Sequence, residues 1–469
     1  MSASQHADSL GSRRDRRGAG GPAALALAAS LLCAQAPASN ELARAVNLAA
    51  RGNFPEAEQV LRALEKTQPT GFEVRYRLGV ILLRQGKTDE AAIRFEAAVQ
   101  LAPRSALAWL GLAQTRLKLG QRQSALDIAG RAAGFGEREP PVWRALALFY
   151  SEAGEFARAA EFEERWSRSP GADRASAARV CRLLVRAADG KRSVDSCRRA
   201  LAGGESAELQ QLLGDAYRLA GDPARAVDAY QRAIGLDPAQ PGAYFQIVAL
   251  FLDHRTPQPA IAMLESAIAR FPTDPEFRRR LGLAHYQTGA IQPAIDAFLS
   301  ALDLEPDADA GYASLETLLP EVGPRLGEII VRLLGFRARR PASPVGHFLL
   351  ARALALEGDS GKEVATLLRQ AVQADGSFWP AHFELAQMHG AEGRIEEVIR
   401  SLESVVKLNP GYAPAHYNLA QHYAQAGDRP RAVEHRKTHH ALLERERAAA
   451  DRGRAESPSL PFRIDAPVR

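Results

Sequence analysis

The chain has 469 residues, of which 46% are hydrophobic and 25% are charged, and this composition excludes a chain that is disordered throughout. It carries 60 Lys and Arg against 55 Asp and Glu, so its formal net charge is only +5. We therefore expect no strong positive field over the fold, and nucleic acid is not an expected partner.

Residues 1–38 have the pattern of an export signal. A basic stretch, Arg13–Arg17, precedes an apolar run from Pro22 to Ala34, and Ala36-Pro37-Ala38 supplies small residues at a cleavage site. The apolar run is too short for a membrane span, and no other segment is long enough, so we expect no integral span. Cleavage after Ala38 would give a periplasmic or secreted protein. The alternatives are a cytoplasmic protein with a disordered leader and an uncleaved leader that anchors the chain.

An internal repeat runs through the remainder of the chain. Three segments share one pattern, and each is followed by a Gly and then, five residues later, by an Ala: they begin at Ser105, Ala207 and Ala413. The pattern resembles the tetratricopeptide repeat, a helix–turn–helix of about 34 residues. Nearly all steps are 34 when the units start at 38, 72, 106, 140, 174, 207, 241, 275, 309, 344, 379 and 413.

The residue types at fixed positions support this register. Position 8 of each unit and position 20, which faces it on the second helix, are mostly Ala or Gly because the two helices approach closely there. Position 15 ends the first helix, where Gly adopts left-handed backbone angles without steric cost. That position is Gly in ten units: Gly52, Gly86, Gly120, Gly154, Gly221, Gly289, Gly323, Gly358, Gly393 and Gly427. The resemblance implies an all-α, right-handed superhelical solenoid of about twelve repeats.

The ninth unit, residues 309–343, departs from the pattern. Glu316 and Glu328 occupy the small positions, and Pro320 falls inside the first helix, which a proline breaks or kinks. We interpret residues 319–343 as a degenerate repeat that acts as a hinge. The alternative is a degenerate repeat that packs normally.

The fifth unit contains the two cysteines that remain after cleavage. Cys181 and Cys197 are about equally far from the turn near Asp189, so both lie at one level of the helix pair. A disulfide between them is therefore geometrically possible and is expected in an oxidising compartment. The alternative is a pair of small buried thiols.

The resemblance also implies where a ligand binds. In this family the first helices line the concave side, and positions 5 and 9 are among those that meet the ligand, often an extended peptide. Phe348, Phe383 and Tyr417 come from consecutive units and form a predicted aromatic ladder beside two amides. The candidate partner-binding residues are Tyr76, Phe245, Arg279, Phe348, Arg352, Phe383, Gln387, Tyr417 and Gln421. The alternative is that the aromatics pack under neighbouring helices and the arginines are solvated.

No other motif indicates chemistry. His435 and His439 are four residues apart on one predicted helix, which is a metal-binding spacing, but no third ligand accompanies them. No phosphate loop, nucleophile elbow or zinc-protease motif occurs. We therefore predict no metal site, no cofactor, no catalytic residues and no enzymatic activity.

These observations give one domain organisation and one function. We expect a leader at 1–38, an N-terminal array at 39–318, the degenerate hinge at 319–343, a C-terminal array with a capping helix at 344–450, and a disordered tail at 451–469. The predicted function is a non-enzymatic scaffold that binds an extended peptide or a partner protein in its concave groove, and the leader predicts a location in the bacterial envelope. Two alternatives remain, a docking subunit of an envelope machine for polysaccharide export or pilus assembly, and a cytoplasmic adaptor. The oligomeric state is left open.

Overall fold

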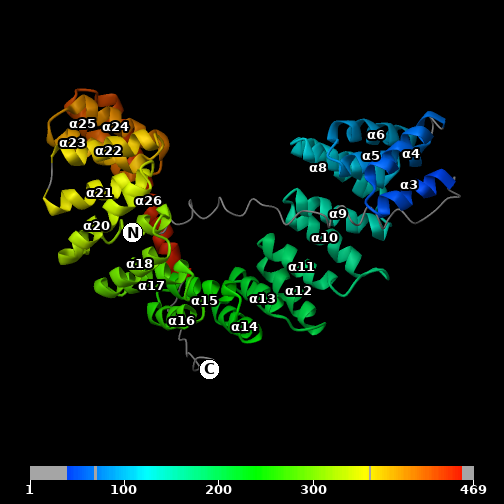
Figure 1. Ribbon diagram of the computed structural model, residues 1–469, viewed down its shortest axis with the longest axis horizontal. Coiled ribbons are helices and arrows are strands. Elements are labelled where there is room, and N and C mark those ends of the chain that lie inside the picture. The colour runs from blue at the N-terminus through cyan, green and yellow to red at the C-terminus, as the bar shows by residue number, and fades with distance from the viewer. Residues whose placement is uncertain (1–39, 68–70, 359–360, 457–469) are drawn as a thin grey trace. The chain divides into compact units, whose positions relative to one another are not determined.

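The computed structural model describes residues 40–67, 71–358 and 361–456, and every regular element within those ranges is a helix (Figure 1). The helices form twelve successive pairs, and the chain divides into two compact units between Pro238 and Ala239. Each unit contains six pairs. The all-α repeat architecture predicted from the sequence is confirmed.

Four of the six pairs of the N-terminal unit begin at the residue where the repeat register places them, and the first and fifth pairs begin slightly later, at Asn40 and Ser176. In chain order they are α3 Asn40–Ala50 with α4 Phe54–Thr67, α5 Phe72–Arg84 with α6 Thr88–Leu101, α7 Ala106–Lys118 with α8 Arg122–Phe135, α9 Pro140–Glu152 with α10 Phe156–Ser167, α11 Ser176–Arg186 with α12 Gly190–Ala202, and α13 Ala207–Leu219 with α14 Pro223–Leu236.

The C-terminal unit continues the same alternation. Its pairs are α15 Pro241–Asp253 with α16 Pro257–Arg270, α17 Pro275–Gln287 with α18 Ile291–Leu304, α19 Asp309–Ala313 with α20 Leu326–Arg339, α21 Pro344–Glu357 with α22 Lys362–Ala374, α23 Trp379–Ala391 with α24 Ile395–Leu408, and α25 Ala413–Gln425 with α26 Arg429–Glu456.

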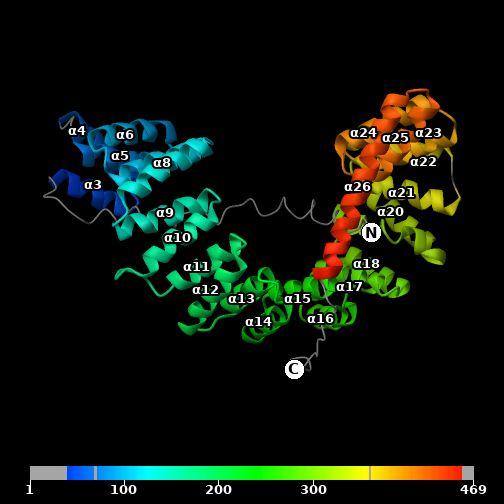
Figure 2. The same ribbon diagram turned by 180° about the vertical axis from the view of Figure 1, so that it is seen from behind.

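Contacts between helices follow one rule within each unit. The two helices of a pair pack together, and each second helix also packs on the first helix of the next pair (Figures 1 and 2). Successive first helices touch as well, as α5 and α7, α11 and α13, and α19 and α21 do. This neighbour-to-neighbour packing is that of a solenoid, in which the first helices of each unit share one side.

The small residues at positions 8 and 20 form the seam of each pair. A Cβ placed on Gly214 of α13 would come within 2.4 Å of the ring of Tyr230 of α14, so only glycine fits there. Position 15 has a positive φ wherever it is Gly, as at Gly289 with φ 75°. The two units that lack Gly keep the same backbone, because Ala188 and Arg255 have φ values of 56° and 55°.

The ninth pair has a broken first helix, as Pro320 predicted. Helix α19 is five residues long, and two short 3₁₀ helices, Leu319–Glu321 and Gly323–Arg325, follow before α20. The hydrophobic core nevertheless continues through this region, where Tyr312 stacks on Phe336 with ring centroids 3.9 Å apart. Residues 319–343 thus contribute side chains to a continuous core. The boundary between the two compact units lies elsewhere, after Pro238, inside the array expected at 39–318.

The C-terminal boundary of the array also differs from the expectation. Helix α26 continues through Glu456, so residues 451–456 are helical and the tail predicted at 451–469 starts later. Residues 457–469 and the leader at 1–38 lie outside the described residues. Within the described residues, no helix combines the length and apolar character that a membrane span needs.

Candidate functional site

The first helices of the last three repeats carry the predicted aromatic and amide residues. Tyr417 on α25 is 49% exposed, and Gln387 on α23 and Gln421 on α25 are exposed as well. Phe383 on α23 is half-buried, with its ring against the ring of Tyr412 at a centroid distance of 5.1 Å. We call these four residues, Phe383, Gln387, Tyr417 and Gln421, the aromatic–amide face.

Phe348 does not belong to this face, which corrects the expected three-membered ladder. It is 2% exposed, and its ring packs edge-on against Phe378 at 5.4 Å. The guanidinium of Arg352 lies over the same ring. Phe378 is the residue before α23 begins, so the loop of the next repeat covers position 5 of α21.

Two glutamates next to this face were not selected from the sequence as binding residues. Arg352 on α21 donates to Glu316 at 3.1 Å and forms an ion pair with Glu384 on α23 at 3.7 Å. Burial raises the pKa of Glu384, although Arg352 opposes that shift. The two carboxylates outnumber the single guanidinium, so the cluster formed by Glu316, Arg352 and Glu384 is acidic. The abnormal Glu316 at a small-residue position was the one sequence signal for it.

Tyr412 connects the acidic cluster to the aromatic residues. Burial raises the pKa of its hydroxyl, and the nearby carboxylates of Glu384 and Glu316 raise it further. Its ring contacts the rings of both Phe383 and Trp379, and the centroid distance to Trp379 is 4.6 Å. The acidic cluster and the aromatic–amide face therefore adjoin, and together they offer apolar rings, amides and a negative charge.

The histidines of α26 make contacts within the helix pair. His435 faces His416 of α25, with their Nδ1 atoms 3.0 Å apart, and the ring of Tyr423 stacks on His435. The Nδ1 atom of His439 lies 3.0 Å from the carbonyl oxygen of Ala413. Among the residues that the structure describes, no three His, Cys, Asp or Glu side chains are grouped as metal ligands.

The predicted residues from other repeats lie in separate places. Tyr76 is packed between Phe72 and Phe95, and burial raises its pKa to about 12. Phe245 stacks on Phe277 with centroids 4.2 Å apart. These aromatics match the alternative in which position 5 packs under a neighbouring helix.

Arg279 is also engaged within the fold. It donates to Glu276 at 2.7 Å and to Glu305 at 2.9 Å, so both of its terminal nitrogens have carboxylate partners. Of the nine candidate binding residues, the structure therefore groups Arg352, Phe383, Gln387, Tyr417 and Gln421, and it leaves the other four in packing or ion-pair roles.

The two cysteines of the fifth repeat are joined in the structure. A disulfide links Cys181 of α11 to Cys197 of α12, with Cα atoms 4.8 Å apart, and both residues are buried. It connects two helices that already pack together. The bond therefore fixes one helix pair, and its closed loop is short, because the two cysteines are 16 residues apart.

These features define an α-helical repeat scaffold with a candidate binding face on its first helices. Sequence models of the tetratricopeptide repeat match residues 42–106 and 247–311, residues 82–149 and 391–435, and residues 207–250. Together the matches span more than half of the chain. The chain belongs to the tetratricopeptide repeat family.

Two curated relatives have the same description. A peroxisomal targeting signal receptor of Kluyveromyces lactis is 23% identical over 244 residues, which are 49% of this chain and 41% of the relative. The receptor of Eremothecium gossypii is 24% identical over 241 residues, 49% of this chain and 40% of the relative. The match thus covers less than half of either relative.

Solved structures include similar repeat proteins of low sequence identity. Yeast Tom70 is 14% identical, with a TM-score of 0.44 and coverage of 91% of this chain and 96% of that chain. The C-terminal part of a repeat-containing protein from Cytophaga hutchinsonii is 16% identical, with a TM-score of 0.39 and coverage of 58% and 98%.

Proposed function

We propose that this repeat scaffold binds an extended segment of a partner protein along α21, α23 and α25. The observation that carries the proposal is the repeated pairing of a ring and an exposed amide. Phe383 precedes Gln387 by four residues, and Tyr417 precedes Gln421 by four residues one repeat later. Rings stack on apolar or Pro-containing residues, and amides bond an extended backbone, so the pairing suits a peptide.

The acidic cluster determines which segment fits best. Glu316 and Glu384 share a single guanidinium, that of Arg352, so their carboxylate oxygens can accept further hydrogen bonds. A Lys or Arg of the ligand can donate to those oxygens. A cation placed there would favour the ionised form of Glu384 and so oppose the burial that raises its pKa. The ligand is therefore an extended segment with an apolar or Pro-containing part and a basic residue.

The relatives support this class of ligand. Both are described as peroxisomal targeting signal receptors, and the matched part covers 41% and 40% of their lengths. Binding of a protein partner by the present chain is in keeping with that description.

Selection of peptides from a displayed library would test the proposal. The full chain is expected to select segments of the stated composition, and the double variant Phe383→Ala with Tyr417→Ala is expected to lose at least about 2 kcal/mol of binding free energy. Val331→Ala on α20 is the matched control, because Val331 is an exposed apolar residue, 68% accessible, on a second helix. Glu384→Gln should weaken only the basic peptides.

Selected peptides that bind the double variant and the unmodified chain equally would contradict the proposal. In that case the exposed ring of Tyr417 would not be a contact. Loss of binding in the Val331→Ala control as well would place the contact on the outer helices instead.

We also propose that the protein is exported to the envelope and that the leader is removed after Ala38. The Cys181–Cys197 disulfide supports this, because such bonds persist in oxidising compartments. The mass of the protein from its native cells distinguishes the alternatives. A chain beginning at Ser39 supports export, and a chain beginning at Met1 with three free thiols, those of Cys33, Cys181 and Cys197, supports the cytoplasmic adaptor. Co-purification with an envelope complex would favour a docking subunit.

A further inference from the structure

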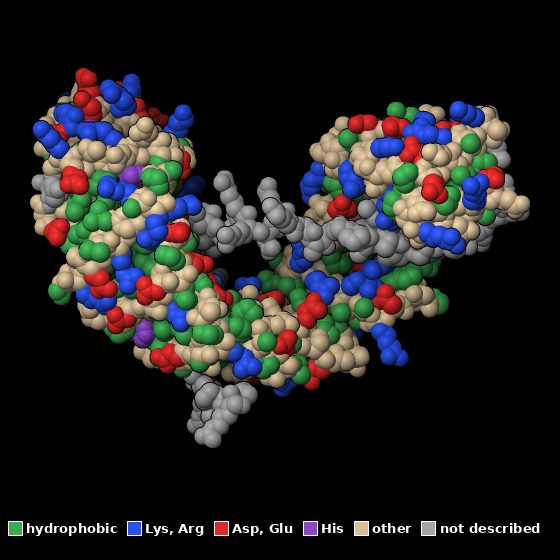
Figure 3. Space-filling view, viewed as in Figure 1, with side chains coloured by type: hydrophobic (Ala, Val, Ile, Leu, Met, Phe, Trp, Pro, Cys, Tyr) green, Lys and Arg blue, Asp and Glu red, His purple; other side chains and the backbone are tan. Residues whose placement is uncertain are grey.

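The fifth repeat, residues 174–206, contains a surplus of positive charge equal to that of the whole chain. It has eight Lys and Arg against three Asp and Glu, and the resulting +5 equals the formal net charge of all 469 residues. Elsewhere on the visible face, side chains of both signs are interspersed (Figure 3). A local excess on a balanced background produces a local positive field, which the overall charge does not reveal.

Half of these basic side chains are used within the fold. Three form ion pairs and a fourth covers an aromatic ring: Arg179 with Glu163 and Asp173, Arg182 with Glu208, Arg192 with Glu164 and Asp189, and Arg186 over Phe156. The other four are exposed and have no ion pair with any residue that the structure describes: Arg174, Lys191, Arg198 and Arg199. Three of those four lie on α12.

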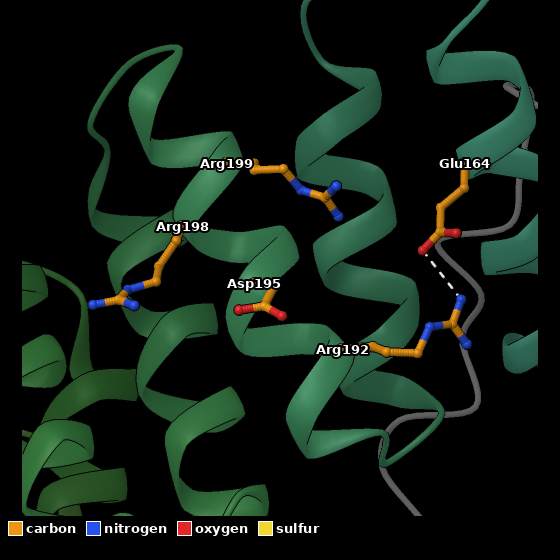
Figure 4. Close-up of a pocket in the computed structure, with 5 residues that line it drawn as sticks. All are labelled: Glu164, Arg192, Asp195, Arg198 and Arg199. Atoms are coloured by element: carbon orange, nitrogen blue, oxygen red, sulfur yellow. Dashed lines mark hydrogen bonds and ion pairs between the residues drawn. The ribbon is translucent and has the colours of Figure 1, made fainter.

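Arg198 and Arg199 line an open groove of about 410 Å³ on the outer helices. The same groove is lined by Arg192 and Asp195 of α12 and by Glu164 of α10, and Figure 4 shows Arg192 bonded to Glu164 while the other two arginines extend without such a bond. Because α10 and α12 are second helices, this groove is not part of the side on which the first helices lie.

Helix α12 presents this groove from a fixed position. Its opposite side is buried through Ser193, Ser196 and Ala200, and Cys197 ties it to α11 through the disulfide. The residue after the bonded cysteine is Arg198 itself. The guanidinium groups therefore extend from a helix whose own freedom is already restricted, which reduces the entropy that binding must offset.

We propose that the outer face of α12 is a second interaction surface, which binds an acidic segment of a partner protein through Arg198 and Arg199. A guanidinium matches a carboxylate in a planar, two-bond geometry. Arg198 and Arg199 extend in different directions from α12 (Figure 4), so the two arginines select Asp or Glu side chains that are spaced apart along the segment. This surface is independent of the aromatic–amide face and lies in the other compact unit.

The acidic residues in the groove favour a protein over a nucleic acid. Asp195 and Glu164 stand between and beside the arginines, and a continuous phosphate backbone would bring anions against both carboxylates. A protein segment can instead place its carboxylates at Arg198 and Arg199 and put a neutral or basic residue opposite Asp195. The partner is therefore acidic in places and not uniformly anionic.

Fluorescence anisotropy with the full chain tests this surface. The probes are a labelled Glu-rich peptide, the same peptide with Gln in place of Glu, and a labelled single-stranded oligodeoxynucleotide. We expect the Glu peptide to bind most tightly and to weaken as salt is raised. Arg198→Glu with Arg199→Glu should weaken it roughly tenfold or more, and Arg198→Gln with Arg199→Gln should give an intermediate loss.

Two control variants make the result interpretable. Arg445→Glu with Arg447→Glu reverses the same number of exposed charges on α26 and should change the affinity for the Glu peptide by less than about twofold. Phe383→Ala with Tyr417→Ala should leave that affinity unchanged, which separates this surface from the proposed peptide face. Equal weakening by the α12 and α26 reversals would overturn the proposal. Tighter binding of the oligodeoxynucleotide, lost in the α12 reversal, would overturn it in favour of a nucleic-acid surface.

Discussion

His416 and His435 face each other across α25 and α26, with their Nδ1 atoms 3.0 Å apart. The Nε2 atom of His416 lies 3.1 Å from the carbonyl oxygen of Pro410, which can only accept a hydrogen bond. His416 therefore donates through Nε2, and its unprotonated Nδ1 accepts from the Nδ1–H of His435. In this contact between the last two helices, His435 is the donor and His416 is the acceptor.

The histidine pair makes the packing of α26 sensitive to pH. Burial, and secondarily His416, lowers the pKa of His435 below its usual value. The unfolded chain then binds more protons than the folded chain as pH falls below about 6.5, so the pair loses stability in that direction. We expect amide hydrogen exchange in α26, corrected for intrinsic rates, to accelerate between about pH 7.5 and 5.5.

A matched pair of variants isolates this effect. His435→Gln should flatten the pH dependence of exchange in α26, and His440→Gln should preserve it because His440 is exposed on the same helix. An unchanged pH dependence in His435→Gln would show that other groups titrate.

Glu163 of α10 holds two arginines in the N-terminal unit. It is 1% exposed, accepts from Arg179 at 2.7 Å and is paired with Arg144, which is itself 8% exposed. Glu163→Gln leaves the guanidinium of Arg144 buried without its anion, so we expect a loss of about 3–5 kcal/mol in the free energy of unfolding. Urea denaturation followed by circular dichroism would measure it.

The control for this change is Glu208→Gln. Glu208 is an exposed partner of Arg182, and an exposed pair contributes less than about 1 kcal/mol. Similar losses in the two variants would mean that Arg144 finds another partner or solvent.

Gly214→Ala tests the close approach within a repeat. The new Cβ would meet the ring of Tyr230 at 2.4 Å, so the helices must separate, and we expect a cost of about 1–3 kcal/mol. Gly130→Ala on α8 is the matched change, because a Cβ there meets nothing within 4 Å. It should stabilise the helix by about 0.5–1 kcal/mol. The midpoint of thermal unfolding would be compared for the two variants. An unchanged midpoint in Gly214→Ala would show that the Tyr230 ring can move to accommodate the new Cβ.

The left-handed turn position allows a reciprocal test in the C-terminal unit. Arg255 has φ 55° and Gly289 has φ 75° at equivalent positions. Arg255→Gly should stabilise the unit by about 0.5–1 kcal/mol, and Gly289→Ala should destabilise it by about 1–2 kcal/mol, since only glycine takes this backbone without steric cost. A denaturant midpoint that falls in Arg255→Gly would mean that the arginine side chain makes a stabilising contact.

Periodic features of the sequence were sufficient to predict the helix pairs. Helices α7, α13 and α21 begin at the first residues of the corresponding sequence units, because small residues and a turn glycine recur at fixed positions in nearly every repeat. The broken first helix of the ninth repeat also followed from one local residue, Pro320. Local chemistry governs where helices start and stop, and it can be read without knowledge of the neighbours.

The binding face could be predicted only in part, since exposure at position 5 depends on the next repeat. Phe348 and Tyr417 occupy equivalent positions, yet Phe378 covers the first, whereas α26 is the one described element that follows the helix of the second. The acidic cluster unites Glu316, Arg352 and Glu384 from three successive repeats, and no local pattern connects them. Helix α26 extends past the predicted end. Residues of the types Ala, Arg and Glu are good helix formers, but they are also common in solvated tails, so composition alone did not mark where the helix ends.

The disulfide in the fifth repeat also has a mechanical consequence. Each residue of an unfolded chain adds at most about 3.3–3.6 Å under tension, so the segment between Cys181 and Cys197, 16 residues apart, withholds roughly 55 Å of extension while the bond is intact. A solenoid pulled from its ends lengthens repeat by repeat. The oxidised fifth repeat would then remain a short, closed link, and reducing it would add one step to the length of the stretched protein.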